Sequence, residues 1–283
     1  MSDALSFAKY QGAGNDVVLV LDAEDRRPLG AEQVARICDR RFGVGADGVI
    51  RLVGDDVDGA RWFMDYRNAD GSLAEVCGNG IRCAAAFLLD RALERGPVLR
   101  IRTRAGVHDL EVDGEGLGRR IGVSMGRAAF ARGQIPMLGP PEATFLGEPV
   151  ELAGARFLAA AVSIGNPHLV LLTDDDPEGI DLTAIGAALA EDPRFPEGVN
   201  VEVARPQGEV LVARVLERGS GETLACGSGA CAIAAVAERL GRSPVRATVR
   251  FPGGDLEVER RAGDELWLRG GAAKVFEGAM ELP

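Results

Sequence analysis

Two stretches of the chain are apolar on every side, whereas much of the rest alternates between apolar and polar residues. Residues 84–89 and 230–237 form the two apolar stretches, and a helix that is apolar all round is a buried one. Alternation is typical of half-buried strands, and it is clearest over residues 98–130. Many short strands and few helices predict an α+β fold, in which a curved, mostly antiparallel sheet wraps around one central apolar helix in each half.

The same pattern predicts further elements around these two helices. Val34, Ile37, Cys38 and Phe42 recur at helical spacing, which predicts an amphipathic helix over 31–42 and makes Cys38 a core residue. Strands are predicted at 17–21, 49–53, 61–66, 157–164, 169–172, 210–216 and 273–278, and a short helix is predicted at 181–190.

One short motif occurs twice, each time at the start of an apolar helix. Residues 77–83 read Cys-Gly-Asn-Gly-Ile-Arg-Cys, and residues 226–231 read Cys-Gly-Ser-Gly-Ala-Cys. The leading cysteines, Cys77 and Cys226, are separated by about half of the chain. One motif in each half predicts two domains, with residues 1–127 in the first and 128–270 in the second. The last predicted strand could belong to either half.

Composition excludes several classes of partner. The net charge of −11 argues against nucleic acid and anionic membranes, because both require a basic surface. No apolar run approaches the ~20 residues of a membrane span, and residues 1–4 lack the basic and apolar segments of a secretion signal. Five cysteines without an export signal predict reduced thiols in the cytoplasm.

A cysteine at the start of a helix has reactive chemistry. The unpaired N–H groups and the positive end of the helix dipole stabilise a thiolate there, and glycines after it let a carboxylate approach the backbone. Two such cysteines on opposite sides of a small molecule could remove a proton from one face of a carbon and deliver a proton to the other. That pattern predicts inversion of a stereocentre, such as the α-carbon of an amino acid.

Other functions remain open on spacing alone. Metal binding would need a Cys/His cluster, and disulfide redox chemistry prefers Cys-x-x-Cys, which neither motif contains. A packing role for both cysteines in a binding module would not explain two matching motifs. The stretch 43–48 fits Gly-x-Gly-x-x-Gly, but it follows a helix and precedes a strand, the reverse of a dinucleotide site. Asn15 and His168 each fit either a turn residue or a site residue.

Several motifs together resemble the diaminopimelate epimerase family. They occur in order along the chain and cover most of it: Gly-Ala-Gly-Asn-Asp at 12–16, Arg-Asn-Ala-Asp-Gly-Ser at 67–72, Gly-Asn-Pro-His at 165–168, Glu-Arg-Gly-Ser-Gly-Glu-Thr at 217–223, and both cysteine motifs. The resemblance implies epimerisation of LL- and meso-2,6-diaminopimelate, without pyridoxal phosphate, another cofactor or a metal, on the route to lysine and peptidoglycan. A proline racemase-like isomerase of the same fold group is the alternative.

The resemblance also implies an arrangement. It implies a homodimer, an active site in the cleft between the two domains, and a C-terminal tail, 271–283, that returns to the first domain. Cys77 and Cys226 match the acid/base pair, and His168 and Glu217 match residues that tune proton transfer. The positions that match substrate-binding residues are Asn15, Asn68, Gly78, Asn79, Asn166, Asn200, Glu217, Arg218, Gly227 and Ser228.

Two positions depart from the family pattern. Some members carry Gln where this chain has Gly48, so a side-chain contact with substrate is not expected there. Ser228 stands where others have Thr, a change that keeps the hydroxyl group.

Overall fold

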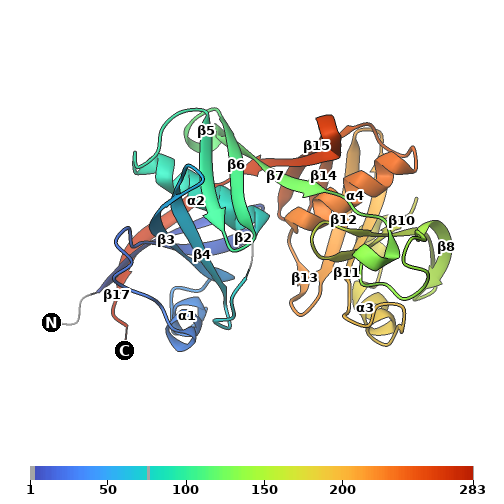
Figure 1. Ribbon diagram of the computed structural model, residues 1–283. Coiled ribbons are helices and arrows are strands. Elements are labelled where there is room, and N and C mark those ends of the chain that lie inside the picture. The colour runs from blue at the N-terminus through green and yellow to red at the C-terminus, as the bar shows by residue number, and fades with distance from the viewer. Residues whose placement is uncertain (1–3, 75–76, 283) are drawn as a thin grey trace. The chain divides into compact units, whose positions relative to one another are not determined.

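The computed structural model describes residues 4–74 and 77–282, apart from the side chain of Leu117. The chain divides into two compact units: Met1–Ser124 together with Arg269–Pro283, and Met125–Leu268. Each unit is a sheet around a buried helix, so the predicted α+β fold is confirmed (Figure 1). The predicted domain limits, 1–127 with 271–283 and 128–270, stay a prediction.

The first unit is built around helix α2 (Gly78–Asp90). Every α2 residue from Gly78 to Leu88 is buried, and the helix contacts β1, β2, β3, β4, β5 and β17. β1 pairs with both β2 and β17, so the C-terminal strand belongs to the sheet of the N-terminal unit. The strands that begin in this unit are β1 (Leu5–Gly12), β2 (Asn15–Leu21), β3 (Gly48–Val57), β4 (Ala60–Asn68), β5 (Val98–Thr103), β6 (Gly106–Asp113), β7 (Arg120–Arg127) and β17 (Ala273–Met280), with the 3-10 helix η1 (Gly116–Gly118) before β7.

The outer face of this sheet carries helix α1 (Ala31–Cys38), where Cys38 is buried as predicted. The prediction that this helix continues to Phe42 is wrong, since α1 ends at Cys38, and Phe42 is 69% exposed and does not continue its buried face. The Asp39 carboxylate accepts hydrogen bonds from the backbone N–H groups of Arg41 and Phe42, both at 2.7 Å. A side chain that captures these donors competes with continued helix formation.

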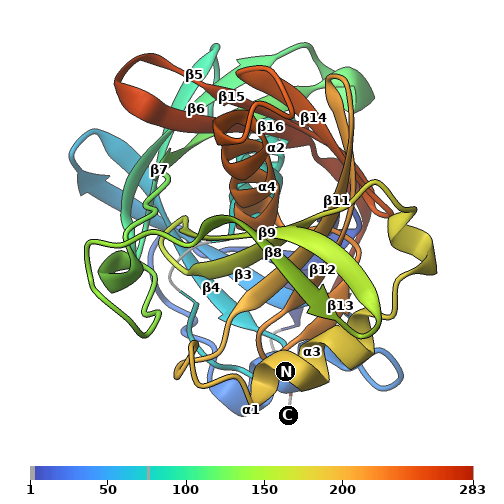
Figure 2. The same cartoon turned by 90° about the vertical axis from the view of Figure 1, so that its right-hand side faces the viewer.

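The second unit repeats this plan around helix α4 (Gly227–Arg239). Figure 2 shows α4 enclosed by strands of its unit, and the helix contacts β9, β10, β11, β12, β14 and β15. The strands that begin here are β8 (Leu146–Leu152), β9 (Ala155–Ser163), β10 (Pro167–Leu172), β11 (Asn200–Gln207), β12 (Val210–Glu217), β13 (Gly221–Thr223), β14 (Arg246–Phe251), β15 (Gly254–Arg260) and β16 (Glu265–Gly271), with the 3-10 helices η2 (Arg132–Gln134), η3 (Pro177–Gly179) and η4 (Ala262–Asp264).

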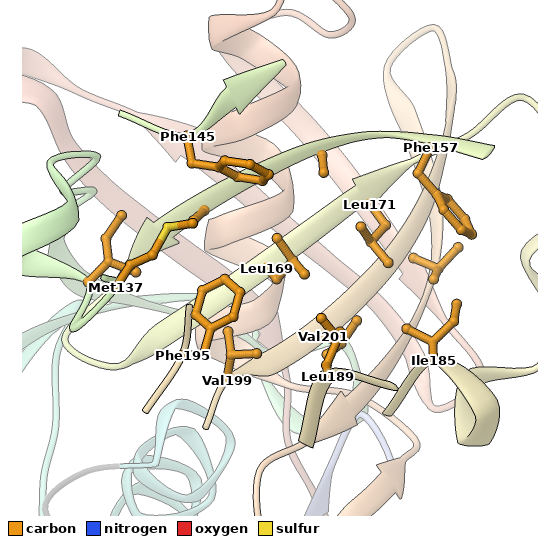
Figure 3. Packing of buried hydrophobic residues seen from close by; sticks show 14 of the residues in the cluster. Met137, Phe145, Phe157, Leu169, Leu171, Ile185, Leu189, Phe195, Val199 and Val201 are labelled. Carbon is orange, nitrogen blue, oxygen red and sulfur yellow. The ribbon is translucent and has the colours of Figure 1, made fainter. Parts of the chain in front are cut away.

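Helix α3 (Leu182–Ala190) covers the outer face of the second sheet. Its Ile185 and Leu189 pack in one cluster with Leu169 and Leu171 of β10 and with Val201 of β11 (Figure 3). Because successive strand residues point to opposite faces, the alternate residues of β10 and β11 point toward α4. Two covered faces explain why every residue of β10 is buried.

Strand pairing extends the repeat beyond the two cysteine motifs. β2–β3 is parallel and β3–β4 antiparallel, and likewise β10–β11 is parallel and β11–β12 antiparallel. In these registers Val17 lies opposite Gly48, and His168 lies opposite Asn200. Val17 and His168 are therefore equivalent positions in the two units, as are Gly48 and Asn200.

None of the helices in the described part of the chain is long and apolar enough to cross a membrane.

Candidate active site

Both cysteines cap the helices that follow them. Cys77 Sγ accepts the backbone N–H of Gly80 at 3.3 Å, and Cys226 Sγ accepts that of Gly229 at 3.4 Å. Each sulfur thus takes the place of the oxygen that usually accepts such a bond at a helix start. The helix dipole and these N–H groups favour negative charge on sulfur.

Asn15 lies beside Cys77. Its Oδ1 is 3.7 Å from Cys77 Sγ, while its Nδ2 donates to Asp47 Oδ2 at 2.9 Å. Burial raises the pKa of the Asp47 carboxyl, which also accepts a hydrogen bond from Arg40. The amide of Asn15 is therefore held with its oxygen toward the sulfur, where it can accept a hydrogen bond from Cys77 whenever that residue holds the proton.

The other predicted residues of the first unit differ in what their side chains do. Asn68 donates from Nδ2 to Ser72 Oγ at 3.0 Å and lies opposite Gly48 in the β3–β4 register. Asn79 Oδ1 accepts a hydrogen bond from the fully buried Arg82 at 2.8 Å. The side-chain oxygen of Asn79 is thus engaged within the unit, whereas the prediction for Asn79 concerns its backbone N–H group.

Cys226 sits in a more buried and more acidic setting. Burial, followed by the carboxylates of Glu217 and Glu202, raises the pKa of Cys226 well above its usual value near 9.0. Ser228 Oγ lies 3.4 Å from the sulfur, and Glu217 is held by a hydrogen bond from Thr223 at 2.6 Å. Burial and the nearby carboxylates thus favour the protonated thiol of Cys226 over its thiolate.

Asn200 and Arg218 are joined by a hydrogen bond. Asn200 Oδ1 accepts the backbone N–H of Arg218 at 2.8 Å, and its Nδ2 donates to Pro167 O at 3.1 Å. The exposed Arg218 guanidinium donates to Glu197 O at 2.7 Å. Asn200 therefore fixes the start of β10 and the end of β12 in relation to each other.

The sequence pattern did not indicate Glu202, which the structure places beside His168. Both side chains are fully buried, with His168 Nδ1 2.7 Å from Glu202 Oε1 and His168 Nε2 2.9 Å from Asn166 Oδ1. A carboxylate between valines in a buried strand, Val201-Glu202-Val203, was the available signal, since such a residue requires a partner. Both ring nitrogens of His168 are thus engaged within the unit.

The predicted residues are divided between the two units, and their joint role in one site stays a prediction. Among the residues described, no three His, Cys, Asp or Glu side chains lie together as a metal site would need. The first unit holds Asn15, Asn68, Cys77, Gly78 and Asn79, and the second unit holds Asn166, His168, Asn200, Glu217, Arg218, Cys226, Gly227 and Ser228.

Solved structures show which known fold the chain has. The chain is similar to a phenazine biosynthesis protein of the PhzF family from Bacillus anthracis, with a TM-score of 0.71 and 17% identity over 98% of this chain and 99% of that one. It is also similar to a hydroxyproline epimerase from Agrobacterium vitis, with a TM-score of 0.69 and 13% identity over 98% and 92%. The fold is that of the PhzF and proline racemase-like proteins.

Sequence comparison then gives the family. The sequence model of diaminopimelate epimerase matches residues 7–131 and 160–275. A diaminopimelate epimerase of Synechococcus sp. (strain JA-3-3Ab) is 43% identical, over 98% of this chain and 99% of its own length. Another, from Moorella thermoacetica, is 40% identical over 98% and 100%. The chain belongs to the diaminopimelate epimerase family, and it is an isomerase of the amino-acid epimerase class.

Proposed function

We propose that the chain interconverts LL- and meso-2,6-diaminopimelate by proton transfer at the α-carbon, with Cys77 and Cys226 as the two acid/base groups. The observation that carries this proposal is the matched pair of helix caps, in which each sulfur accepts the third N–H of its helix. Full-length relatives of more than 40% identity support diaminopimelate as the substrate over proline.

Binding uses the helix starts and the polar residues around them. The backbone N–H groups of Gly78, Asn79, Gly227 and Ser228 receive the α-carboxylate, since helix N-termini attract anions. Asparagine amides and the Arg218 guanidinium suit the ammonium and carboxylate groups of a long diamino acid. The substrate-binding residues proposed from side chains are Asn15, Asn68, Asn166, Asn200, Glu217 and Arg218.

The reaction begins with one thiol and one thiolate. Because the pKa of Cys226 is raised, we assign the proton to Cys226 and the negative charge to Cys77. Cys77 takes the α-proton, the electron pair of the broken C–H bond stays on the α-carbon, and Cys226 delivers its proton to the opposite face. The product leaves Cys77 protonated and Cys226 ionised, which is the starting state for the reverse reaction.

The test is proton NMR of reduced protein with LL-diaminopimelate in D₂O, without added cofactor. We expect the α-proton signal to disappear and the meso isomer to appear. Cys77→Ala and Cys226→Ala should each reduce epimerisation by at least about a thousandfold, since each removes an obligatory proton carrier. Exchange with proline but not with diaminopimelate would move the substrate, and near-normal turnover in either variant would remove the two-base scheme.

We further propose that the chain works as a cytoplasmic homodimer that associates through its first unit. Reduced thiols at Cys77 and Cys226 suit a reducing compartment. Phe42 and Phe276 line a surface hollow with Phe7 and Met280, and Phe42 and Phe276 are 69% and 44% exposed. Grouped aromatic residues of this kind are enriched at protein interfaces.

A further inference from the structure

We infer that Glu202 is a positioning residue, which holds the proton on His168 Nε2 and thereby turns the NH₂ group of Asn166 toward the substrate. The inference rests on the proposed function only in giving Asn166 a substrate contact. Three side chains form the chain of contacts: Glu202 Oε1 is 2.7 Å from His168 Nδ1, and His168 Nε2 is 2.9 Å from Asn166 Oδ1.

The two units show that packing does not require this pair. Val17 is equivalent to His168 by register. Ile50 is likewise equivalent to Glu202. In β2–β3 Ile50 lies opposite Leu19, two residues after Val17, and in β10–β11 Glu202 lies opposite Val170, two residues after His168. Ile50 and Glu202 also sit at the same point of the following helix: a Cβ added to Gly80 would lie 3.1 Å from Ile50 Cδ1, and one added to Gly229 would lie 2.8 Å from Glu202 Oε1.

An apolar pair therefore fills the same place in the first unit. Val17, Ile50, His168 and Glu202 are all fully buried. Burying a carboxyl and an imidazole is costly unless they are paired. Because the fold accepts valine and isoleucine at these positions, the polar pair of the second unit calls for a role beyond packing.

The net charge of the Glu202–His168 pair decides where its protons lie. Glu202 Oε2 is buried and has no hydrogen-bond partner among the residues that the structure describes, so a net negative charge on the pair would be poorly compensated. The pair is neutral when it holds two protons, one between Glu202 Oε1 and His168 Nδ1 and the other on His168 Nε2. The Nε2–H then donates to Asn166 Oδ1, and the opposite, donor side of the Asn166 amide is left for a substrate carboxylate.

Nitrogen-15 NMR of the substrate-free protein tests this proton placement directly. The chain contains only two histidines, so Thr103→Val, which removes the hydroxyl 3.0 Å from His108 Nε2, identifies the other signal. We expect His168 Nε2 to be protonated at pH 7 in the wild type and in Glu202→Gln, whose amide can donate to Nδ1. Glu202→Ile should give a mixture of tautomers. An unprotonated Nε2 in the wild type would overturn the inference.

Kinetics separate positioning from packing. Glu202→Ile should raise KM for diaminopimelate about tenfold or more, with a smaller effect on kcat, as expected for one misplaced hydrogen bond to a charged group. Glu202→Gln should stay within about threefold of wild type. Thr103→Val, the matched control at the other histidine, should leave KM unchanged. A KM within twofold of wild type in Glu202→Ile, or equal loss in both Glu202 variants, would overturn the inference.

A double variant guards against simple misfolding. His168→Val with Glu202→Ile gives the second unit the pair that the first unit already has, so it should unfold at a temperature close to that of the wild type and still show the raised KM. A normal KM in this folded variant would contradict the inference. If the wild type does not turn over diaminopimelate at all, the proposed function fails, and the NMR result still decides the arrangement of Glu202, His168 and Asn166.

Discussion

At the scale of single residues, the state of the Cys226 thiol is the most consequential feature. Burial raises its pKa first, and the carboxylates of Glu217 and Glu202 add to this effect. A raised pKa means that the thiolate is scarce below the ordinary thiol range and appears only at higher pH.

We therefore expect Cys226 to react slowly with iodoacetamide between pH 7 and 9 in the folded protein. Glu217→Gln removes one negative charge near the sulfur and should raise the alkylation rate at fixed pH, by roughly threefold to tenfold. Mass spectrometry of peptides containing Cys226 measures the rate, with protein in urea as the reference. A rate in the folded protein equal to that in urea would contradict a raised pKa.

The sequence was sufficient to locate both cysteines, because the Gly-rich motif around them repeats. It did not locate Glu202. A carboxylate between two valines indicates a residue that requires a partner, but only the register with β10 shows that this partner is His168. Nor could it show that the Asn79 side chain is held by Arg82. Contacts of this kind depend on which strands and helix turns become neighbours, which local sequence does not determine.

At the scale of elements, the tight start of each helix depends on a glycine at its third position. Ala is the better helix former by about 1 kcal/mol, so the neighbours decide the outcome. A Cβ at either position would lie close to the Cβ of the capping cysteine, 3.3 Å from Cys77 at Gly80 and 3.2 Å from Cys226 at Gly229. The two sites differ in the other neighbour, which is the flexible end of Ile50 at 3.1 Å for Gly80 and the buried Glu202 carboxylate at 2.8 Å for Gly229.

We expect Gly229→Ala to lower the free energy of unfolding by about 1–3 kcal/mol, the usual cost of overpacking. Gly80→Ala should change it by less than about 1 kcal/mol, because Ile50 can shift and helix propensity improves. Urea unfolding followed by circular dichroism compares the two variants. Equal destabilisation would show that the Glu202 carboxylate does not constrain the start of α4.

A second element-scale prediction concerns Asp16, which joins β2 to the loop after α1. Burial would raise its pKa, but hydrogen bonds from Arg40 and Lys9 outweigh burial and lower the pKa to about 2, against 3.8 for an ordinary Asp. A lowered pKa gives stability that is present above about pH 3.8 and is lost as pH falls toward 2.

We expect Asp16→Asn to reduce the free energy of unfolding at pH 7, because the variant loses the charged hydrogen bonds from Arg40 and Lys9. The loss should be only about 1 kcal/mol, because the variant also removes a negative charge beside Asp47. The difference from wild type should shrink as the pH falls from 4 to 2. Urea titrations across that range measure it. A difference that stays constant with pH would assign the effect to lost hydrogen bonds alone.

Helix prediction failed where a side chain intervened. The periodicity of Val34, Ile37 and Cys38 correctly indicated α1, but Phe42 continued the pattern only by coincidence. Asp39 ends the helix by accepting the next two N–H groups. The sequence alone does not show that Asp39 ends the helix, because Asp residues also occur on the exposed faces of helices.

At the scale of the whole molecule, the repeat is deeper than the sequence indicates. Only the cysteine motifs are visibly alike, yet strand order, pairing direction and register agree around both helices. The apolar pattern could predict a sheet around each helix, because burial on both faces makes the strands apolar. It could not predict the pairing, because many apolar strands are interchangeable partners. The shared framework explains how one position holds Ile50 for packing and Glu202 for proton placement.

The exposed aromatic surface of the first unit leads to the prediction for assembly. Phe42 and Phe276 line one hollow, and Phe276 packs edge-on against Phe7 with ring centroids 5.8 Å apart. A second copy that covers this hollow would remove both exposed rings from water, at about 25 cal/mol per Å² of apolar area. We therefore expect a species of about twice 29.8 kDa in solution.

Light scattering after size-exclusion chromatography measures that mass over a range of concentrations. Phe42→Glu should shift the protein to the monomer, because two buried charges would face each other across a symmetric interface. Val98→Glu is the matched control, since Val98 is 58% exposed and does not line the hollow; it should leave the dimer intact. A wild type that is monomeric at every concentration, or a Phe42→Glu protein that remains dimeric, would show that this surface is not where the chains associate.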